Sequence, residues 1–320
     1  TTTLVQGIKD TSTRLHQVLV CAASNTAVDL LTLKCSEQGL SVLRLGNPAR
    51  VDDKLLRLTL DGRVSDHPDY KALRKLRQEI EKIRKKALQY KRSFGGKERR
   101  RRDELFDEVR ELKAHAHKLE DYILHQVLNR SQVIAATLTG ANHSLLAHKR
   151  FHTVFIDEAA QALEPACWIP LLRAGRVIFA GDHFQLPPTV KSLEAEQKGL
   201  GHTLFEEVMK RHPRASVMLE QQYRMHYQIM GFSGQQFYQG KLQADPSVRY
   251  RSLGQNFAPL EFVDTAGCGF LERKNPETLS TSNPEEAQLL LRHLALLLNR
   301  LEAEKPETFA DETFSIGIIA

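Results

Sequence analysis

Two adjacent acidic residues, Asp157 and Glu158, directly follow an apolar run at 153–156 that is typical of a buried strand. A carboxylate at the tip of such a strand can hold Mg²⁺ through water, and its neighbour can orient or deprotonate an attacking water. The pair alone is a weak signal, because acidic residues after a strand often only cap a helix. Together with the residues described next, the acidic pair indicates metal-assisted phosphoryl chemistry.

A second strand-like run, 177–180, ends in the string Gly-Asp-His-Phe-Gln-Leu-Pro-Pro-Thr at 181–189. The amide of Gln185 is neutral, so it can contact both a γ-phosphate and the attacking water without binding the metal. The alternative is a polar turn held by its two prolines, which explains the prolines but not the whole string.

A further apolar run is followed by Tyr223 and Arg224. An arginine that reaches across a domain cleft stabilises the charge on a transferring phosphoryl group, and the tyrosine beside it can stack on a base. An ordinary structural arginine is the alternative interpretation of Arg224.

The basic charge of the chain is concentrated in one segment. The 320 residues contain 45 Lys+Arg and 39 Asp+Glu, which gives a net charge of +6. Positions 71–130 hold 19 basic and 10 acidic residues, so this segment carries +9 and the remainder −3. The segment is either a solvated stalk, whose charges serve solubility, or a surface that contacts phosphates.

Composition excludes several classes of protein. Hydrophobic residues make up 41% and charged residues 26%, a normal globular balance that argues against disorder or a fibre. The longest apolar runs are far too short to cross a bilayer. The four cysteines form no CxxC pair and no metal-ligand spacing, so we expect a cytoplasmic protein in a reducing, intracellular setting.

The elements that position these residues alternate between strands and helices. Short apolar runs at 18–22, 41–45 and 133–137 are typical of buried parallel strands, as are the two runs that precede the candidate site residues. The stretch 27–33 has the apolar spacing of a helix. Strands that alternate with helices imply right-handed βαβ units, and the sequence therefore predicts an α/β fold with a doubly wound parallel sheet.

The basic segment reads as an insertion between the second and third strands. Positions 70–90 and 104–128 have helical composition and apolar spacing, with a break around Gly95 and Gly96. The pattern predicts an antiparallel helical hairpin whose tip carries the four arginines at 99–102.

A second α/β unit is predicted to begin near position 213. A helix is expected at 284–300, with Asn283 as its N-cap and Pro284 at its first position. The expected strands of this unit are 215–219, 260–263 and 314–319.

The start of the chain is rich in threonine, with Thr1, Thr2 and Thr3 before Leu4. A phosphate-binding loop is Gly-rich, followed by Lys, by Ser or Thr, and by a helix. We expect Thr1 to be that hydroxyl residue and the Gly-Lys to lie upstream of it. Both ends of the chain have the character of cuts, so we interpret the sequence as a fragment of a longer protein.

Several short segments occur in a characteristic order: 1–5, 23–29 (ASNTAVD), 136–141 (ATLTGA), 157–160 (DEAA), 181–189 (GDHFQLPPT) and 222–226 (QYRMH). In this order they resemble the motifs of superfamily 1 helicases of the 5′→3′ branch. The segments 45–50, 162–172 and 263–269 strengthen the likeness to the group of the immunoglobulin-mu-binding-protein and nonsense-mediated-decay helicases. The resemblance covers nearly the whole chain.

The resemblance implies RecA-like doubly wound parallel sheets of the P-loop NTPase type. It implies a first motor domain made of 1–65 and 129–212, in which the basic hairpin, 66–128, is an insertion. The remainder, 213–320, would be an incomplete second motor domain.

The resemblance also implies roles for individual residues, with ATP and Mg²⁺ as cofactors. Thr1 and Asp157 would ligate Mg²⁺, and Glu158 would be the general base. Gln185 would couple the γ-phosphate to movement, and Arg224 would touch the γ-phosphate. Expected to bind the nucleotide are Thr1, Thr2, Gln222 and Tyr223. Expected to contact the phosphates and sugars of a nucleic-acid strand are Ser24, Asn25, Thr137, Thr139, Pro188 and Thr189.

The function implied is an ATP-dependent helicase or translocase that moves 5′→3′ on single-stranded DNA or RNA as a monomer. One alternative is a non-translocating ATPase that clamps RNA or remodels a complex. Another is a non-catalytic binding module with the hairpin as a docking arm, which the set Asp157, Glu158, Gln185 and Arg224 disfavours. We expect the 320 residues alone to hydrolyse ATP poorly, because the Gly-Lys and later motifs of the family are missing.

Overall fold

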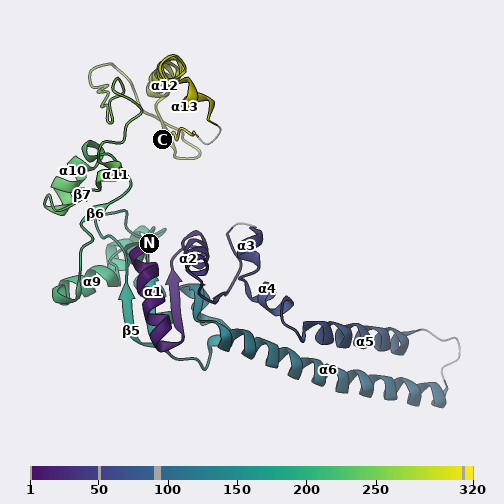
Figure 1. Ribbon diagram of the computed structural model, residues 1–320. Helices are drawn as coiled ribbons and strands as arrows, with labels where there is room; N and C mark the ends of the chain where they lie inside the picture. The colour runs from purple at the N-terminus through teal and green to yellow at the C-terminus, as the bar shows by residue number, and fades with distance from the viewer. Residues whose placement is uncertain (1, 50–51, 90–94, 312–313, 320) are drawn as a thin grey trace. The chain divides into compact units, whose positions relative to one another are not determined.

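The computed structural model describes residues 2–49, 52–89, 95–311 and 314–319 (Figure 1). The chain divides into two compact units, Thr1–Met218 and Leu219–Ala320, and each is described by itself. Within the described ranges, no helix combines the length and the apolar character that a membrane span requires.

The first unit is built on a five-stranded sheet with the order β2-β3-β1-β4-β5. All neighbouring strands in it are parallel. The strands are β1 (Val18–Ala22), β2 (Val42–Arg44), β3 (Val133–Thr137), β4 (Phe151–Asp157) and β5 (Ala174–Phe179). Every strand predicted for this unit is present, because short runs of consecutive apolar residues are what a strand buried on both faces requires.

Apolar side chains of alternate residues form a core on each face of the sheet. Val18 and Val20 of β1 face a cluster that includes residues of α1 (Thr2–Leu15) and α2 (Asn25–Glu37). Leu19 and Cys21 face the other cluster, which includes residues of α7 (Glu164–Leu171) and of the hairpin. The predicted doubly wound α/β architecture is therefore confirmed.

The predicted hairpin is also present, as α5 (Tyr70–Leu88) and α6 (Gly96–Arg130), which pack side by side and project from the sheet (Figure 1). Leu73, Ile80 and Ile83 of α5 and Val109 of α6 are buried in the same core cluster. The arginines at 99–102 lie in the first turns of α6 and not in a loop. The prediction of a start at 104 was wrong because it followed apolar spacing, whereas arginine itself favours helix. Positions 90–94 of the expected break lie outside the described residues.

Shorter helices complete the first unit: α3 (Asp53–Leu56), α4 (Leu60–Ser65), α8 (Leu193–Ala195) and α9 (Leu204–Arg211). Short 3-10 or π turns occur at Thr139–Asn142, Ser144–Leu146, Ala159–Gln161, Glu196–Leu200 and Pro213–Ala215. Helix α9 has a complete capping box, in which Thr203 and Glu206 bond to each other's backbone N–H.

In its described part, the second unit consists of helices and short strands joined by irregular segments. Its helices are α10 (Tyr227–Tyr238), α11 (Pro246–Arg249), α12 (Pro284–Glu304) and α13 (Pro306–Ala310). Its strands are short pairs: β6 (Gln221–Gln222) with β7 (Gln243–Ala244), and β8 (Arg273–Lys274) with β9 (Thr281–Ser282). The predicted cap of α12 is confirmed, since the side chain of Asn283 accepts a hydrogen bond from the N–H of Glu286 at 3.1 Å.

The strands predicted at 215–219, 260–263 and 314–319 are wrong for the described residues, which form no paired strand there. Apolar side chains in these segments are exposed, among them Val217 (88%), Phe262 (87%) and Ile319 (96%). An apolar run can join a sheet only where a neighbouring strand supplies hydrogen bonds and a covering layer, and neither is present at these positions.

Candidate nucleotide and nucleic-acid site

The carboxyl edge of the five-stranded sheet gathers six of the predicted site residues. In the strand register, Ala22 pairs with both Thr137 and Asp157, so the ends of β1, β3 and β4 lie in one row. Ser24, Asn25, Thr139 and Glu158 follow within three residues of these strand ends. Ligands of open α/β sheets bind outside this edge, and the structure thus brings the two acids and the small polar residues to one place.

The two acids differ in their environments. Asp157 is half-buried at the end of β4, and burial raises the pKa of its carboxyl, although the backbone N–H of Glu158 and the charge of Lys34 oppose this shift. Glu158 is exposed and has left-handed backbone angles, φ 50° and ψ 41°. Such a conformation costs a residue with a side chain about 1–3 kcal/mol and occurs often at active sites.

Backbone hydrogen bonds tie the turn after β4 to the end of β5. The N–H of Ala159 donates to the carbonyl of Ala180 at 2.9 Å, and the N–H of Ala180 donates to Ile156 at 2.8 Å. A Cβ at Gly181 would lie 3.0 Å from the nitrogen of Ala160, which is tighter than nine in ten real Cβ contacts, so the neighbouring backbone would have to shift by a few tenths of an ångström. Gly181 therefore lets the two strand ends meet. A glycine directly after a predicted strand could have indicated this close approach, but the approach was not predicted.

Asp182 organises the turn that carries Gln185. Its carboxylate accepts hydrogen bonds from the N–H of Phe184 at 3.1 Å and from Nε2 of Gln185 at 2.9 Å. Farther along, Pro188 is buried and Thr189 is exposed. The amide of Gln185 is thus held by its own turn, a positioning role for Asp182 that the sequence analysis did not assign.

The predicted strand-binding residues also shape their own loops. The hydroxyl oxygen of Ser24 accepts from the N–H of Ala27 at 3.2 Å and caps α2. The hydroxyl oxygen of Thr137 accepts from the N–H of Gly140 at 3.0 Å. Thr139 is exposed, and its Oγ1 lies 3.5 Å from that of Thr137. Each hydroxyl that accepts a bond retains a hydrogen that can be donated to a phosphate or sugar oxygen.

A buried ion pair, Arg44 with Asp29, holds the side chain of Asn25 in place. Nε of Arg44 in β2 donates to Oδ1 of Asp29 in α2 at 2.9 Å, and the Arg44 side chain is 1% exposed. Nη2 of Arg44 also donates to Oδ1 of Asn25 at 2.8 Å, and the other Asp29 oxygen accepts from the N–H of Ala49 at 2.6 Å. This network fixes the first turn of α2 and the loop after β2. The sequence analysis missed it, although an Asp on a helix and an Arg in a buried strand were visible signals.

The predicted magnesium site rests on Asp157 among the described residues. Thr1, its expected partner, lies outside them, and Thr2 is exposed in the first turn of α1. No group of three or more His, Cys, Asp or Glu side chains in the described ranges could hold a metal ion. Mg²⁺ commonly takes only one or two carboxylates and completes its shell with phosphate and water oxygens, so a single half-buried carboxylate at a sheet edge fits this ion.

Three predicted residues belong to the second unit. The amide of Gln222 folds its own turn, because Oε1 accepts from the N–H groups of Arg224 at 2.8 Å and Met225 at 2.9 Å, while Nε2 donates to the Met225 carbonyl at 2.7 Å. Tyr223 and Arg224 are exposed. Gln222 thus presents its two neighbours to solvent, and its own amide is already engaged.

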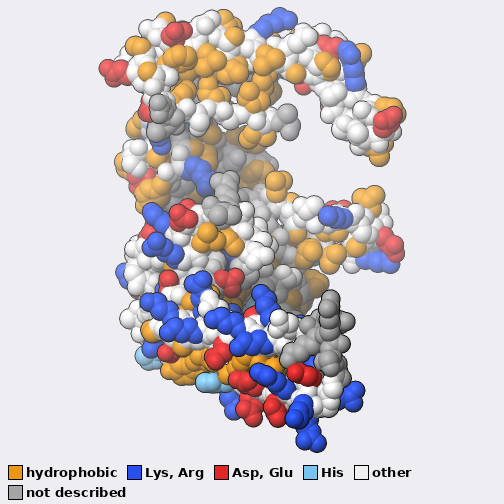
Figure 2. Space-filling model, turned by 90° about the vertical axis from the view of Figure 1, so that its right-hand side faces the viewer, with side chains coloured by type: hydrophobic (Ala, Val, Ile, Leu, Met, Phe, Trp, Pro, Cys, Tyr) orange, Lys and Arg blue, Asp and Glu red, His pale blue; other side chains and the backbone are white. Residues whose placement is uncertain are grey.

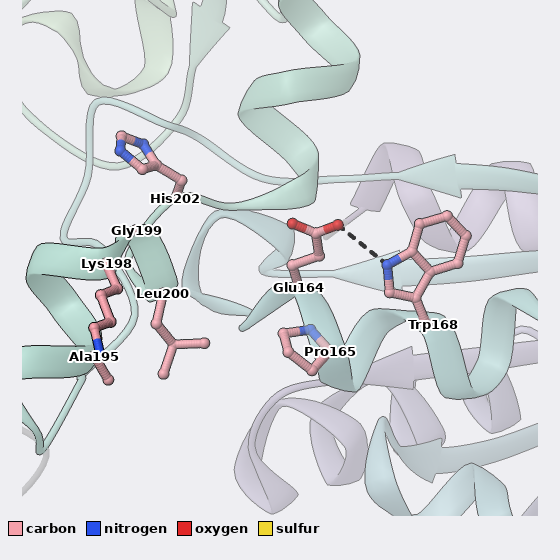
Figure 3. Close-up of a pocket in the computed structure, with 8 residues that line it drawn as sticks. All are labelled: Glu164, Pro165, Trp168, Ala195, Lys198, Gly199, Leu200 and His202. Atoms are coloured by element: carbon pink, nitrogen blue, oxygen red, sulfur yellow. Dashed lines mark hydrogen bonds between the residues drawn. The ribbon is translucent and has the colours of Figure 1, made fainter.

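A hollow of about 520 Å³ lies elsewhere in the first unit, between α7 and the segment 195–202 (Figure 3). Within it, the indole N–H of Trp168 donates to the carboxylate of Glu164 at 3.2 Å. None of the predicted site residues lines this hollow. The hollow is therefore separate from the site that the sequence predicts.

Comparisons with known proteins identify the family of the chain. A family described as "AAA domain" matches residues 1–193, and a second family of the same description matches residues 200–320. The chain belongs to the AAA-domain family of superfamily 1 helicases.

Individual relatives in this family carry names that refer to nucleic acid. The chain is 34% identical to DNA-binding protein SMUBP-2 of Rattus norvegicus, over 93% of this chain and 31% of that protein. It is 36% identical to DNA polymerase alpha-associated DNA helicase A of Schizosaccharomyces pombe, over 95% of this chain and 47% of that protein. It is 33% identical to the regulator of nonsense transcripts 1 homolog of Drosophila melanogaster, over 79% and 20%. The chain thus spans less than half the length of these helicase-family relatives.

Proposed function

We propose that this chain forms part of an ATP-dependent helicase or translocase that acts on single-stranded nucleic acid. The observation that carries the proposal is the row formed by Asp157, Ala22 and Thr137 at the carboxyl edge of the sheet. It sets carboxylates suited to phosphoryl chemistry beside small polar groups suited to a sugar-phosphate backbone. Membership in a helicase family supports the same assignment.

The chemistry proposed for the edge uses each side chain in one role. Asp157 and the hydroxyl of Thr1 hold Mg²⁺, which neutralises charge on the ATP phosphates when bound. Glu158, in its left-handed turn, accepts a proton from the attacking water. Gln185 contacts that water and the γ-phosphate. Arg224 stabilises the developing charge from the second motor domain.

Nucleotide and strand contacts complete the proposed site. Thr2, Gln222 and Tyr223 lie around the nucleotide. Ser24, Asn25, Thr137 and Thr139 contact the strand, together with Pro188 and Thr189. These contacts go to phosphate and sugar and do not read the base sequence, which suits a protein that moves along any strand.

The wider assignment concerns the whole protein. Residues 1–65 and 129–212 form the first motor domain, 66–128 its inserted hairpin, and 213–320 belong to the second. The protein works 5′→3′ as a monomer, on DNA or RNA, in a reducing intracellular setting. Support for that setting comes from the sequence, in which the four cysteines form no CxxC pair and no metal-ligand spacing.

The deciding experiment compares the ATPase of the full-length protein with and without single strands. We expect stimulation by single strands, and we expect Glu158→Gln to lower kcat by about 10²–10⁴-fold because the general base is lost. Glu164→Gln is the matched control, since Glu164 follows the same strand but bonds to Trp168 and lies outside the site.

Three outcomes separate the possibilities. An ATPase that ignores nucleic acid would refute the proposal. Stimulation without displacement of a strand from a 5′-tailed duplex would instead indicate a non-translocating clamp or remodelling switch. If Glu158→Gln and Glu164→Gln lowered kcat equally, Glu158 would not be the general base.

A further inference from the structure

The two helices of the hairpin differ sharply in charge. Helix α5 carries eight basic and two acidic residues, a net charge of +6 over its 19 positions. Helix α6 carries nine basic and eight acidic residues, a net charge of +1 over 35 positions. The excess charge of the hairpin therefore lies on α5, and the long partner helix is almost neutral.

The arginines at 99–102 do not form a basic tip. Positions 97–108 of α6 contain five basic residues, including these four, and five acidic residues. One acidic residue precedes the arginines and four follow them, so positions 97–108 as a whole have no net charge although 97–102 alone are basic. This part of the hairpin offers little attraction to a polyanion.

On α5 the basic side chains form a stripe along the face opposite the buried apolar residues. We call this the basic stripe; its members are Lys71, Arg74, Lys75, Lys82, Lys85 and Lys86. They recur at three- and four-residue intervals and are all exposed, whereas Leu73, Ile80 and Ile83 are buried. Figure 2 shows basic side chains gathered in the lower part of the view, over the hairpin.

The basic stripe is not neutralised within the protein. The ion pairs on α5 are Arg77 with Glu120 at 2.7 Å and Arg84 with Glu81 at 3.5 Å, and both flank the stripe. No member of the stripe forms an ion pair with a described residue. A shallow groove on the same helix is lined by Arg74, Arg77, Gln78, Glu81, Lys82 and Lys85.

Repulsion within the stripe opposes the isolated helix, and Glu79 and Glu81, one turn from Lys82 and Lys85, offset only part of it. Like charges three or four residues apart, such as Lys71 with Lys75 and Lys82 with Lys86, destabilise a helix by about 0.2–0.5 kcal/mol per pair. Solubility alone would be served as well by the mixed charges of α6. Binding of an external polyanion would neutralise the stripe and remove this repulsion, which would explain why so many basic residues lie on one face of α5.

We propose that the basic stripe of α5 binds the phosphate backbone of duplex nucleic acid. The inference rests on the proposed helicase function and names a second contact for its substrate, separate from the single-strand residues at the sheet edge. Helix α5 is about 28 Å long, at about 1.5 Å per residue, and duplex DNA presents about one negative charge per 1.7 Å of its axis.

The side chains on the stripe favour a duplex over a single strand. Single-strand sites combine basic residues with aromatic side chains on which the exposed bases stack. Positions 71–86 contain no aromatic residue. A duplex hides its bases and offers mainly phosphates to such a surface, so a row of basic side chains without aromatic partners matches it.

The test measures binding of the full-length protein to a blunt 20-base-pair duplex, and to one of its single strands, over a series of salt concentrations. The stripe variant is Arg74→Gln, Lys82→Gln and Lys85→Gln combined. The matched control is Arg99→Gln, Arg100→Gln and Arg101→Gln combined, which removes the same charge from exposed positions of α6. Circular dichroism confirms that both variants keep their helices.

We expect the stripe variant to bind the duplex about tenfold more weakly or worse at 100 mM salt. The slope of log K against log salt should shrink by about three, since each lost phosphate contact removes about 0.9. The control should keep the wild-type slope, and neither variant should lose single-strand affinity or single-strand stimulation of the ATPase.

Two results would overturn the inference: equal changes in duplex slope for the two variants, or a loss of single-strand affinity as large as the loss for the duplex. The second result would place a single strand on the stripe. Failure of the proposed helicase function is a distinct result, because it would appear as a wild-type ATPase that single strands do not stimulate.

Discussion

The sheet edge of the first unit and the basic stripe of α5 present polar groups in opposite ways. At the sheet edge, side chains and backbone are fixed by specific bonds, such as that of Ala159 to Ala180 at 2.9 Å. On the stripe, long basic side chains stand in solvent without ion partners among the described residues. We therefore expect the function of the sheet edge to depend on the exact positions of its side chains, because proton transfer requires them. We expect binding by the stripe to depend on its total charge, because attraction between charges tolerates movement.

The comparison predicts that single substitutions have large effects at the sheet edge and small, additive effects on the stripe. Four substitutions test this difference, from the largest expected effect to the smallest.

Loss of Arg44 should have the largest effect. Arg44→Leu leaves the carboxylate of Asp29 buried without its partner, and we expect the free energy of unfolding to fall by about 3–5 kcal/mol. Urea unfolding measures this change. Adding Asp29→Leu should recover part of the loss, because the uncompensated charge is gone. A loss below about 1 kcal/mol in the single variant would show that the network does not hold the edge together.

Crowding at Gly181 should have the next largest effect. In Gly181→Ala the new Cβ lies 3.0 Å from the nitrogen of Ala160 and must shift the turn that carries Glu158. We expect kcat of the single-strand-stimulated ATPase to fall about 10²-fold with little change in KM for ATP. Gly175→Ala in β5 is the control, since its Cβ would meet only the His152 carbonyl at 3.9 Å. Equal kinetics in the two variants would refute a positioning role.

A single neutralisation on the stripe should have a small effect. Lys82→Gln alone is expected to lower the duplex salt slope by about one and to leave kcat unchanged. Adding Lys85→Gln should lower it by a similar further amount, as measured by anisotropy titrations. A single substitution that abolished duplex binding would show that the stripe, too, works through one fixed contact.

Removal of the half-buried charge at Asp157 should change the free energy of unfolding less than the other sheet-edge substitutions, and with the opposite sign, although its effect on activity is large. Burial raises the folded-state pKa of Asp157, so the folded protein binds this proton more tightly than the unfolded chain does. Stability from this group is present at low pH and is lost as pH rises from the ordinary carboxyl pKa through the raised one. Asp157→Asn should therefore slightly raise Tm at neutral pH without nucleotide, yet abolish ATPase activity. If the difference in Tm between Asp157→Asn and wild type were the same at pH 4 and pH 7, this prediction would be contradicted.

Much of the first unit could be predicted from local patterns. The runs 18–22 and 133–137 are each apolar throughout or nearly so, and both form strands with the predicted bounds. The hairpin followed from apolar residues at helical spacing, such as Leu73, Ile80 and Ile83. In these segments the side chains that define the period are the ones that become buried, so the pattern and the packing carry the same information.

The same reasoning failed where partners decide the outcome. The apolar run at 260–263 has a composition suited to a strand, but Phe262 is 87% exposed and no neighbouring strand pairs with it. The arginines at 99–102 suggested a charged tip, but the following acidic residues of α6 cancel them. The first result cannot be read from a single segment, because it depends on whether a neighbouring strand is present. The second was readable from the sequence of 97–108 itself.

The sequence by itself determined which chemical groups this protein has: two acids after β4, an amide after β5, small polar residues after β1 and β3, and a basic insertion. Tertiary structure alone decided how they are arranged. It placed Asp157 and Thr137 in one row beside Ala22, joined Arg44 to Asp29, and left the basic stripe of α5 exposed and without ion pairs to the described residues. The physical reason is that hydrogen bonds and ion pairs act over a few ångströms in space, whereas a motif records only distance along the chain.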